Sequence, residues 1–227
     1  MDLRPGADKV KIGLAQRLLK ELMKKHEPPD WAWKLANGDI DFRGEHLANQ
    51  IFSGLDLHQR DFRRAFLRGA KFDGCDLTDA NFAEADLSGA NFREAQCRDV
   101  DFSNANLSRT NFYLANLQGA AFLGSNLFST VFRESQMGQT VFANLDLETC
   151  AGLDAVKHVG PSSIAMECLY RSGNNLPMTF LKGVGLPQIL LDYLPALIEA
   201  GTPIQFNSCF VSYLGSNERD PPKAVVR

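Results

Sequence analysis

The sequence predicts an all-β solenoid, because three features recur together over residues 38–150. Every fifth residue from Phe42 to Leu147 is large and apolar, and we call this residue the centre of its repeat. In most repeats a small residue stands two positions before the centre, and Gly or Asn often stands two positions after it. A period of five fits neither the helix repeat of 3.6 nor the strand repeat of 2, whereas a coil of short turning segments accommodates it.

Composition and charge exclude several classes of protein. The 227 residues include 24 Lys and Arg against 27 Asp and Glu, a net charge of −3, which excludes a broadly basic nucleic-acid binder. The chain has no apolar leader at its start and no run of 18 apolar residues, so we expect neither a secretory signal nor membrane attachment. Its five Cys and four His have no disulfide or metal-ligand spacing, which favours free thiols in a reducing cytoplasm and no metal or other cofactor.

Within each repeat, the centre and the small residue before it are expected to point into a narrow core. Cys97 replaces a Leu centre, so we interpret it as a buried apolar residue rather than a nucleophile. The Gly or Asn after the centre would occupy the third position of a type II turn, which requires φ > 0. The expected core phenylalanines are Phe62, Phe72, Phe82, Phe92, Phe102, Phe112, Phe122 and Phe132.

The repeats resemble the pentapeptide-repeat family, whose pattern is A-(D/N)-(L/F)-x-x. Segments that carry the resemblance include Ala80-Asn81-Phe82, Ala85-Asp86-Leu87 and Ala90-Asn91-Phe92. The resemblance implies a right-handed quadrilateral β-helix with four repeats in each coil. With twenty residues per coil, Phe42 and every twentieth residue after it would stack in one column. Phe52 and every twentieth residue after it would stack on the opposite side.

The flanking segments lack the period of five, and we expect them to close the two ends of the solenoid. Residues 1–37 would form an N-terminal cap, in which residues 7–25 read as an amphipathic helix. Trp31 and Trp33 would then cover the first coil. Glu45, Gln50 and Arg60 replace the small residue in early repeats, as expected of a capping coil.

Residues 151–202 are expected to form a helical C-terminal segment. Ser162 or Ser163 would N-cap a helix that runs to Arg171 and ends at Gly173. A second short helix is expected from residues 177 to 183. Residues 187–200 are too apolar for exposure, and Pro195 would kink this helix or begin another.

Residues 203–227 resemble the first strand and loop of a Toll/interleukin-1 receptor (TIR) domain, following the connector found in bacterial fusions of pentapeptide repeats to such domains. The resemblance rests on Cys209-Phe210-Val211-Ser212-Tyr213 and Asp220. Only seven residues follow Asp220, so this end is either a truncated TIR-like segment or a strand that serves another purpose, and the family's NAD-cleaving glutamate has no counterpart here. No catalytic residue is assigned, and we expect no enzymatic activity.

Two functions remain open from the sequence. The first is a non-enzymatic scaffold or protein-interaction module, since rigid solenoids commonly act through their side surfaces. The second is implied by the resemblance, because quinolone-resistance members have been assigned DNA mimicry of a type II topoisomerase, DNA gyrase. Residues 38–150 carry 16 acidic and 10 basic residues, and the interspersed arginines dilute the acidic field that such mimicry requires.

A candidate interaction surface lies where charge disappears from the repeats. Residues 74–109 contain ten charged residues, whereas residues 110–145 contain two, Arg133 and Glu134. Either residues 161–200 fold back over this surface, or it binds a second copy or an unidentified protein partner. Its outward apolar residues are Tyr113, Leu114, Leu123, Phe128, Val131 and Val141.

Overall fold

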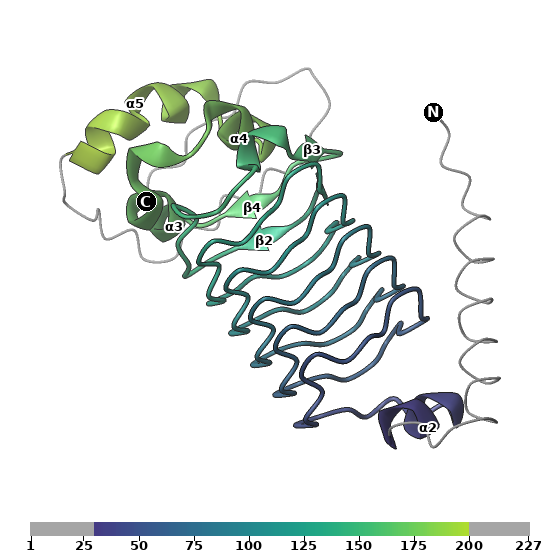
Figure 1. Cartoon of the computed structure of the whole chain (residues 1–227). Coiled ribbons are helices and arrows are strands. Elements are labelled where there is room, and N and C mark those ends of the chain that lie inside the picture. Colours follow the sequence, from purple (N-terminus) through teal and green to yellow (C-terminus); the bar gives the residue numbers. More distant parts are fainter. Residues whose placement is uncertain (1–29, 200–227) are drawn as a thin grey trace, which may run out of the picture.

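The protein is a stack of coils closed by helices at both ends (Figure 1). The computed structural model describes residues 30–199. Helix α2, Asp30–Ala36, lies at the first coil, and α3, Met166–Ser172, α4, Met178–Gly183, and α5, Gln188–Glu199, gather at the other end. The predicted helix over 7–25 and the TIR-like strand over 203–214 lie outside the described residues.

Parallel β-bridges join each coil to the next at a spacing of twenty residues. The bridges run from Asp41↔Asp61 to Val131↔Ala151 without a change of register. In most repeats the centre N–H donates to a carbonyl of the next coil, as Phe62 N does to Asn81 O at 2.7 Å. Four repeats therefore complete one coil, and successive repeats occupy successive sides.

Tight turns separate the sides of every coil. The residue two positions after each centre has a positive φ from Gly44 through Asn144, which confirms the prediction for the Gly and Asn positions. The third residue after the centre donates its N–H to the centre carbonyl, as Ala65 N does to Phe62 O at 3.0 Å. Arg64 and Leu114 also adopt φ of 60° here, which sequence analysis did not anticipate. Ladder and turn hydrogen bonds fix this conformation even where a side chain disfavours it.

The core consists of two columns of phenylalanine that meet inside the coils. Rings one coil apart lie nearly parallel, with centroids 4.8 Å apart for Phe62 and Phe82. Rings from the two columns meet edge to face, as Phe92 and Phe102 do at 5.8 Å with an interplanar angle of 89°. Every expected core phenylalanine is fully buried. The columns lie on opposite sides of the coil but form one continuous aromatic core.

The position of the small residue is also buried in most repeats, and most polar atoms there have a partner, although the Ser135 hydroxyl has none. The hydroxyls of Thr110, Thr130 and Thr140 each donate to a carbonyl of the preceding coil, at 2.8–3.0 Å. The Cys75 thiol donates to Phe52 O in the same way. These hydrogen bonds offset the cost of burying the four polar groups.

Helix α2 covers the first coil through one face. The Trp31 ring lies 4.6 Å from that of Phe52, and its indole N–H donates to the Gln50 side chain at 2.9 Å. Lys34 pairs with Glu45, so two of the irregular early repeats serve this contact. The prediction that Trp33 also covers the coil is wrong, because Trp33 is 49% exposed. On a helix, side chains two residues apart point to nearly opposite faces.

The ladder of parallel pairings continues beyond the repeats, but the number of residues between paired positions increases at the last coil. Strand β1, Gln136–Met137, pairs with β3, Lys157–His158, at a spacing of 21 residues. Strand β2, Val141–Phe142, pairs with β4, Ser163–Ile164, at a spacing of 22. The 3-10 turn η1, Leu153–Ala155, precedes β3. The chain therefore closes the solenoid with two non-repeating rungs.

The C-terminal helices differ from the predictions in three respects. Ser163 lies in β4, so neither serine caps α3, whose N-cap residue Ala165 makes no side-chain capping bond. Pro195 lies inside α5 rather than starting another helix. Ile189 and Tyr193 are more than 60% exposed, because the face of α5 that packs against the protein carries Leu191, Leu194 and Ile198. The predicted end of α3 at Gly173 and the short helix α4 are confirmed, and the turn η2, Gly173–Asn175, joins them.

The first prediction tests the aromatic core. Phe102→Ala should lower the free energy of unfolding by about 3–5 kcal/mol, because it leaves a cavity bounded by rigid rings. Urea unfolding monitored by circular dichroism measures this. Phe128→Ala, at an exposed position of the same segment, should change it by less than about 0.5 kcal/mol. Equal effects of the two substitutions would contradict the assigned core.

The second prediction separates backbone strain from steric clash. A methyl group at Gly74, where φ is +63°, meets no atom within 4 Å, so Gly74→Ala should cost only the strain of about 1 kcal/mol. At Gly152, with φ of +76°, the added carbon would lie 2.6–2.7 Å from Arg133 backbone and Cβ atoms. Gly152→Ala should therefore lower the melting temperature clearly more than Gly74→Ala. The reverse order would contradict the arrangement of the last coil.

Candidate interaction surface

Each repeat presents three outward positions: the residue before the centre and the two after it. The residue before the centre is commonly Asp or Asn, and its Oδ1 accepts the N–H two residues on, as Asn81 does from Ala83 at 2.9 Å. Asn106 and Asn126 also donate their amide N–H to the equivalent residue one coil earlier. These side chains therefore support the turns and the stacking of the coils.

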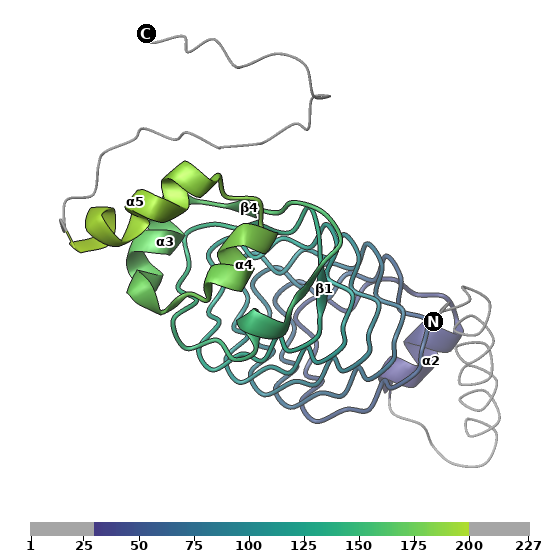
Figure 2. The same cartoon turned by 90° about the horizontal axis from the view of Figure 1, so that it is seen from above.

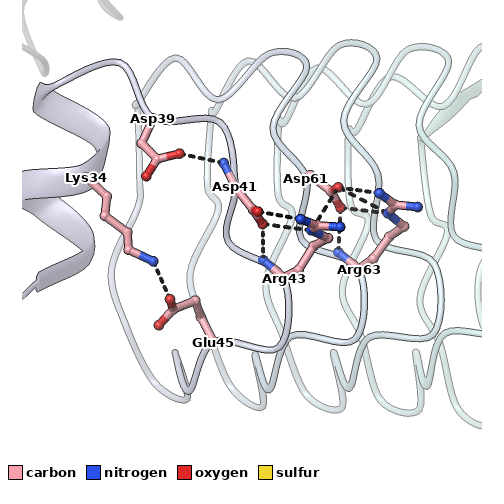
Figure 3. A network of polar contacts seen from close by, with 7 residues as sticks. All are labelled: Lys34, Asp39, Asp41, Arg43, Glu45, Asp61 and Arg63. Carbon is pink, nitrogen blue, oxygen red and sulfur yellow. Dashed lines mark hydrogen bonds and ion pairs between the residues drawn. The ribbon is translucent and has the colours of Figure 1, made fainter.

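Ion pairs line one side of the first two coils, next to α2 (Figure 3). Arg43 bonds to Asp41, and Arg63 to Asp61, each with an Nη2–Oδ2 distance of 2.6 Å. Arg43 also lies 3.6 Å from Asp61, which links the two pairs. Hydrogen bonds from these arginines lower the pKa of both carboxyl groups. Arg64 pairs with Glu84 one coil further. Much of the acidic charge near this end is therefore compensated locally.

The charge-poor coils expose two large apolar side chains. Leu123 is 47% exposed and Phe128 is 52% exposed. They occupy the position after the centre in successive repeats, and so lie on neighbouring sides of one coil. Within the segment that separates Arg109 from Arg133 no side chain carries a formal charge. This pair forms the most exposed part of the predicted surface.

The other four predicted residues are half-buried. Val131 and Val141 belong to the ladder and face their counterparts in neighbouring coils. The Tyr113 ring carries the Arg93 guanidinium 5.2 Å from its centroid, so charge from the preceding coil reaches this side. Leu114 occupies a turn. The structure therefore divides the predicted band into an exposed pair and four residues that mainly support the coil.

One expectation was that residues 161–200 fold back over this surface. Residues 161–199 do not do so. They lie across the end of the last coil instead (Figure 2). Glu167 accepts from the Asn144 N–H at 3.3 Å, and the Ser172 hydroxyl accepts from Leu147 N–H at 2.9 Å. The two extra rungs β3 and β4 direct the chain along the solenoid axis rather than along its side. Leu123 and Phe128 stay exposed for this reason.

Sequence analysis missed a second exposed apolar group near the first coil. Phe66, which is 48% exposed, stacks on His46 with ring centroids 4.5 Å apart, and Ile51 is 60% exposed. All three stand immediately before a centre, where Asp or Asn is usual. That departure from the repeat was the available signal.

The chemistry of an enzyme finds little support among the described residues. Cys75 and Cys97 are fully buried, and burial raises the pKa of Cys75 to about 12 and that of Cys97 well above its usual range. A reactive thiol needs exposure and a lowered pKa, so Cys97 is a buried apolar residue as interpreted. Over residues 30–199 no cluster of three metal-ligating side chains occurs. No helix in that range is long and apolar enough to cross a membrane.

A family model described as pentapeptide repeats matches residues 40–79, 61–95 and 95–134, with 8 copies in all. Among solved structures, a pentapeptide-repeat protein from the thylakoid lumen of Arabidopsis thaliana is 41% identical. That match covers 41% of this chain and 69% of the other, with a TM-score of 0.36.

Two further structures are similar over larger shares of the chain. HetL, a pentapeptide-repeat protein involved in heterocyst differentiation regulation in Nostoc sp. strain PCC 7120, is 19% identical over 55% of this chain and 74% of its own, with a TM-score of 0.25. Full-length QnrB1, a plasmid-mediated fluoroquinolone resistance protein, is 19% identical over 66% of this chain and 85% of its own, with a TM-score of 0.34. No curated protein matches the chain.

Proposed function

Since residues 40–134 belong to the pentapeptide-repeat family, we propose that the protein is a non-enzymatic scaffold that binds a protein partner through its last coils. The observation that supports this most directly is the exposure of Leu123 and Phe128 in a charge-poor stretch. Large exposed apolar side chains in a stretch of sequence that lacks charge favour contact with another protein over contact with water.

The rigidity of the scaffold supports the same proposal. Ladder hydrogen bonds hold the backbone before and after Phe128, as Arg109 N donates to Phe128 O at 2.8 Å. The aromatic core fixes the coil from within. A surface that is already ordered loses little conformational entropy on binding, so a small apolar patch can bind usefully.

The proposed partner is a protein, either a second copy of the chain or another polypeptide. Nucleic acid is a poor partner because arginines near the first coils are paired with carboxylates. The described cysteines are free thiols, which favours a reducing cytoplasm as the place of action. No membrane contact is proposed.

The third prediction tests the surface. Phe128→Asp should abolish binding of the partner, because a charge would be buried at the contact. Affinity capture with the full chain identifies the partner, and sedimentation velocity detects self-association. Ser88→Asp, at the same position of the repeat two coils earlier, should leave both unchanged. If Phe128→Asp and Ser88→Asp behave alike at equal thermal stability, the proposal is wrong.

The fourth prediction addresses DNA mimicry of gyrase, the alternative implied by the family. Mimicry needs dense uncompensated negative charge, whereas Asp41, Asp61 and Glu84 have arginine partners. We expect supercoiling by purified gyrase to be unaffected at sub-micromolar concentrations of this protein. Inhibition that persists at physiological salt would favour the alternative, because non-specific charge effects weaken with salt.

A further inference from the structure

We infer that His158 is an internal pH sensor that controls whether the C-terminal helices remain docked on the last coil. Its position in the ladder is the first argument. His158 pairs in register with Met137, a centre residue that is fully buried. Met137 continues the column of Leu117 and Cys97. A titratable side chain therefore ends a column that is apolar in every coil beneath it.

The surroundings of the imidazole ring offer no polar partner. Both ring nitrogens are buried, and neither has a hydrogen bond. The Phe180 ring of α4 lies 5.7 Å away, and a methyl group added to Gly183 would overlap the imidazole. The centroid of the Phe180 ring lies in turn 6.0 Å from that of Phe142. The ring is thus held between the last coil and α4, where a positive charge would lack compensation.

No ionised group faces the ring from the elements packed against it. Strand β1 contributes Gln136 and Met137, which do not titrate. On its own strand, Lys157 is exposed and lies 3.6 Å from Glu134. On α4, Lys182 is exposed, and on η1, which contacts α4, so is Asp154. Burial is the cause that lowers the pKa of His158 below 6.5.

The sign of the pH effect follows from this shift. The undocked segment binds a proton at His158 near pH 6.5, whereas the docked segment binds it only at lower pH. Docking is therefore fully stable above pH 6.5 and weakens as the pH falls towards the pKa of the docked state. One proton per opening event makes the open fraction rise by up to about tenfold per pH unit within that window.

Undocking would release a defined set of contacts. Val159 N donates to Met137 O and Ser163 N to Thr140 O, both at 2.8 Å, and Ala165 N donates to Phe142 O at 2.9 Å. Losing them would expose the backbone edges of β1 and β2, which resemble an edge strand open to pairing. The sensor would thus convert a closed end of the solenoid into an interaction site at acidic pH.

The fifth prediction uses hydrogen exchange of the full chain, corrected for the intrinsic pH dependence of exchange. Between about pH 7 and pH 5, the opening constant at Val159, Ser163 and Ala165 should rise at least several-fold. Amides of the middle coils should show no such change. In His158→Leu, which restores the residue type of Leu117, the rise should disappear. His58→Gln, at an exposed histidine, should behave as the wild type.

Nuclear magnetic resonance titration of the histidine rings in the wild-type chain supplies a measurement that needs no variant. The His158 ring should titrate below the ordinary histidine pKa of about 6.5, over the range in which the three amides lose protection. Unchanged protection down to pH 5 would overturn the inference. So would a His158→Leu chain that opens with the same pH dependence as the wild type.

Discussion

The structure depends on the packing of phenylalanine rings within coils of twenty residues. Each ring stacks on those one coil away and meets the opposite column edge to face, as Phe102 does with Phe122 at 5.2 Å and with Phe112 at 5.5 Å. Offset-stacked and edge-to-face arrangements are the favoured geometries of aromatic pairs. Insertion of a single residue would shift every later ring out of its column, so the core enforces the register of the ladder.

The turns and the small residues follow from that constraint. A coil that holds two large rings leaves space only for a small side chain two positions before each centre. Each side of the coil is also short, so the chain must turn every five residues. The turn conformation is imposed even on Arg64 and Leu114, which have no glycine-like freedom. Local strain persists because the ladder hydrogen bonds on both sides hold the backbone in place.

The outer surface is correspondingly free to vary, and function belongs there. Ion pairs dominate the first coils, whereas Leu123 and Phe128 stand in a charge-poor region near the end. The end itself departs from the repeat, since β3 and β4 add rungs of different spacing and place the half-buried His158 ring, with both nitrogens out of contact with water, against α4. The same end thus combines an exposed apolar pair with a half-buried titratable group.

The sequence by itself determined the repeat, the buried phenylalanines and the turn positions, because each pentapeptide carries its own pattern and is reinforced by identical neighbours. It did not determine the ends. The exposure of Trp33 and Tyr193, the inclusion of Ser163 in a strand and the inward position of His158 depend on which surface of the finished coil each segment meets. Likewise, the exposure of Leu123 and Phe128 was decided by the path of β3 and β4 along the solenoid axis. Non-repeating residues have no local period to set their register, so only tertiary contacts place them.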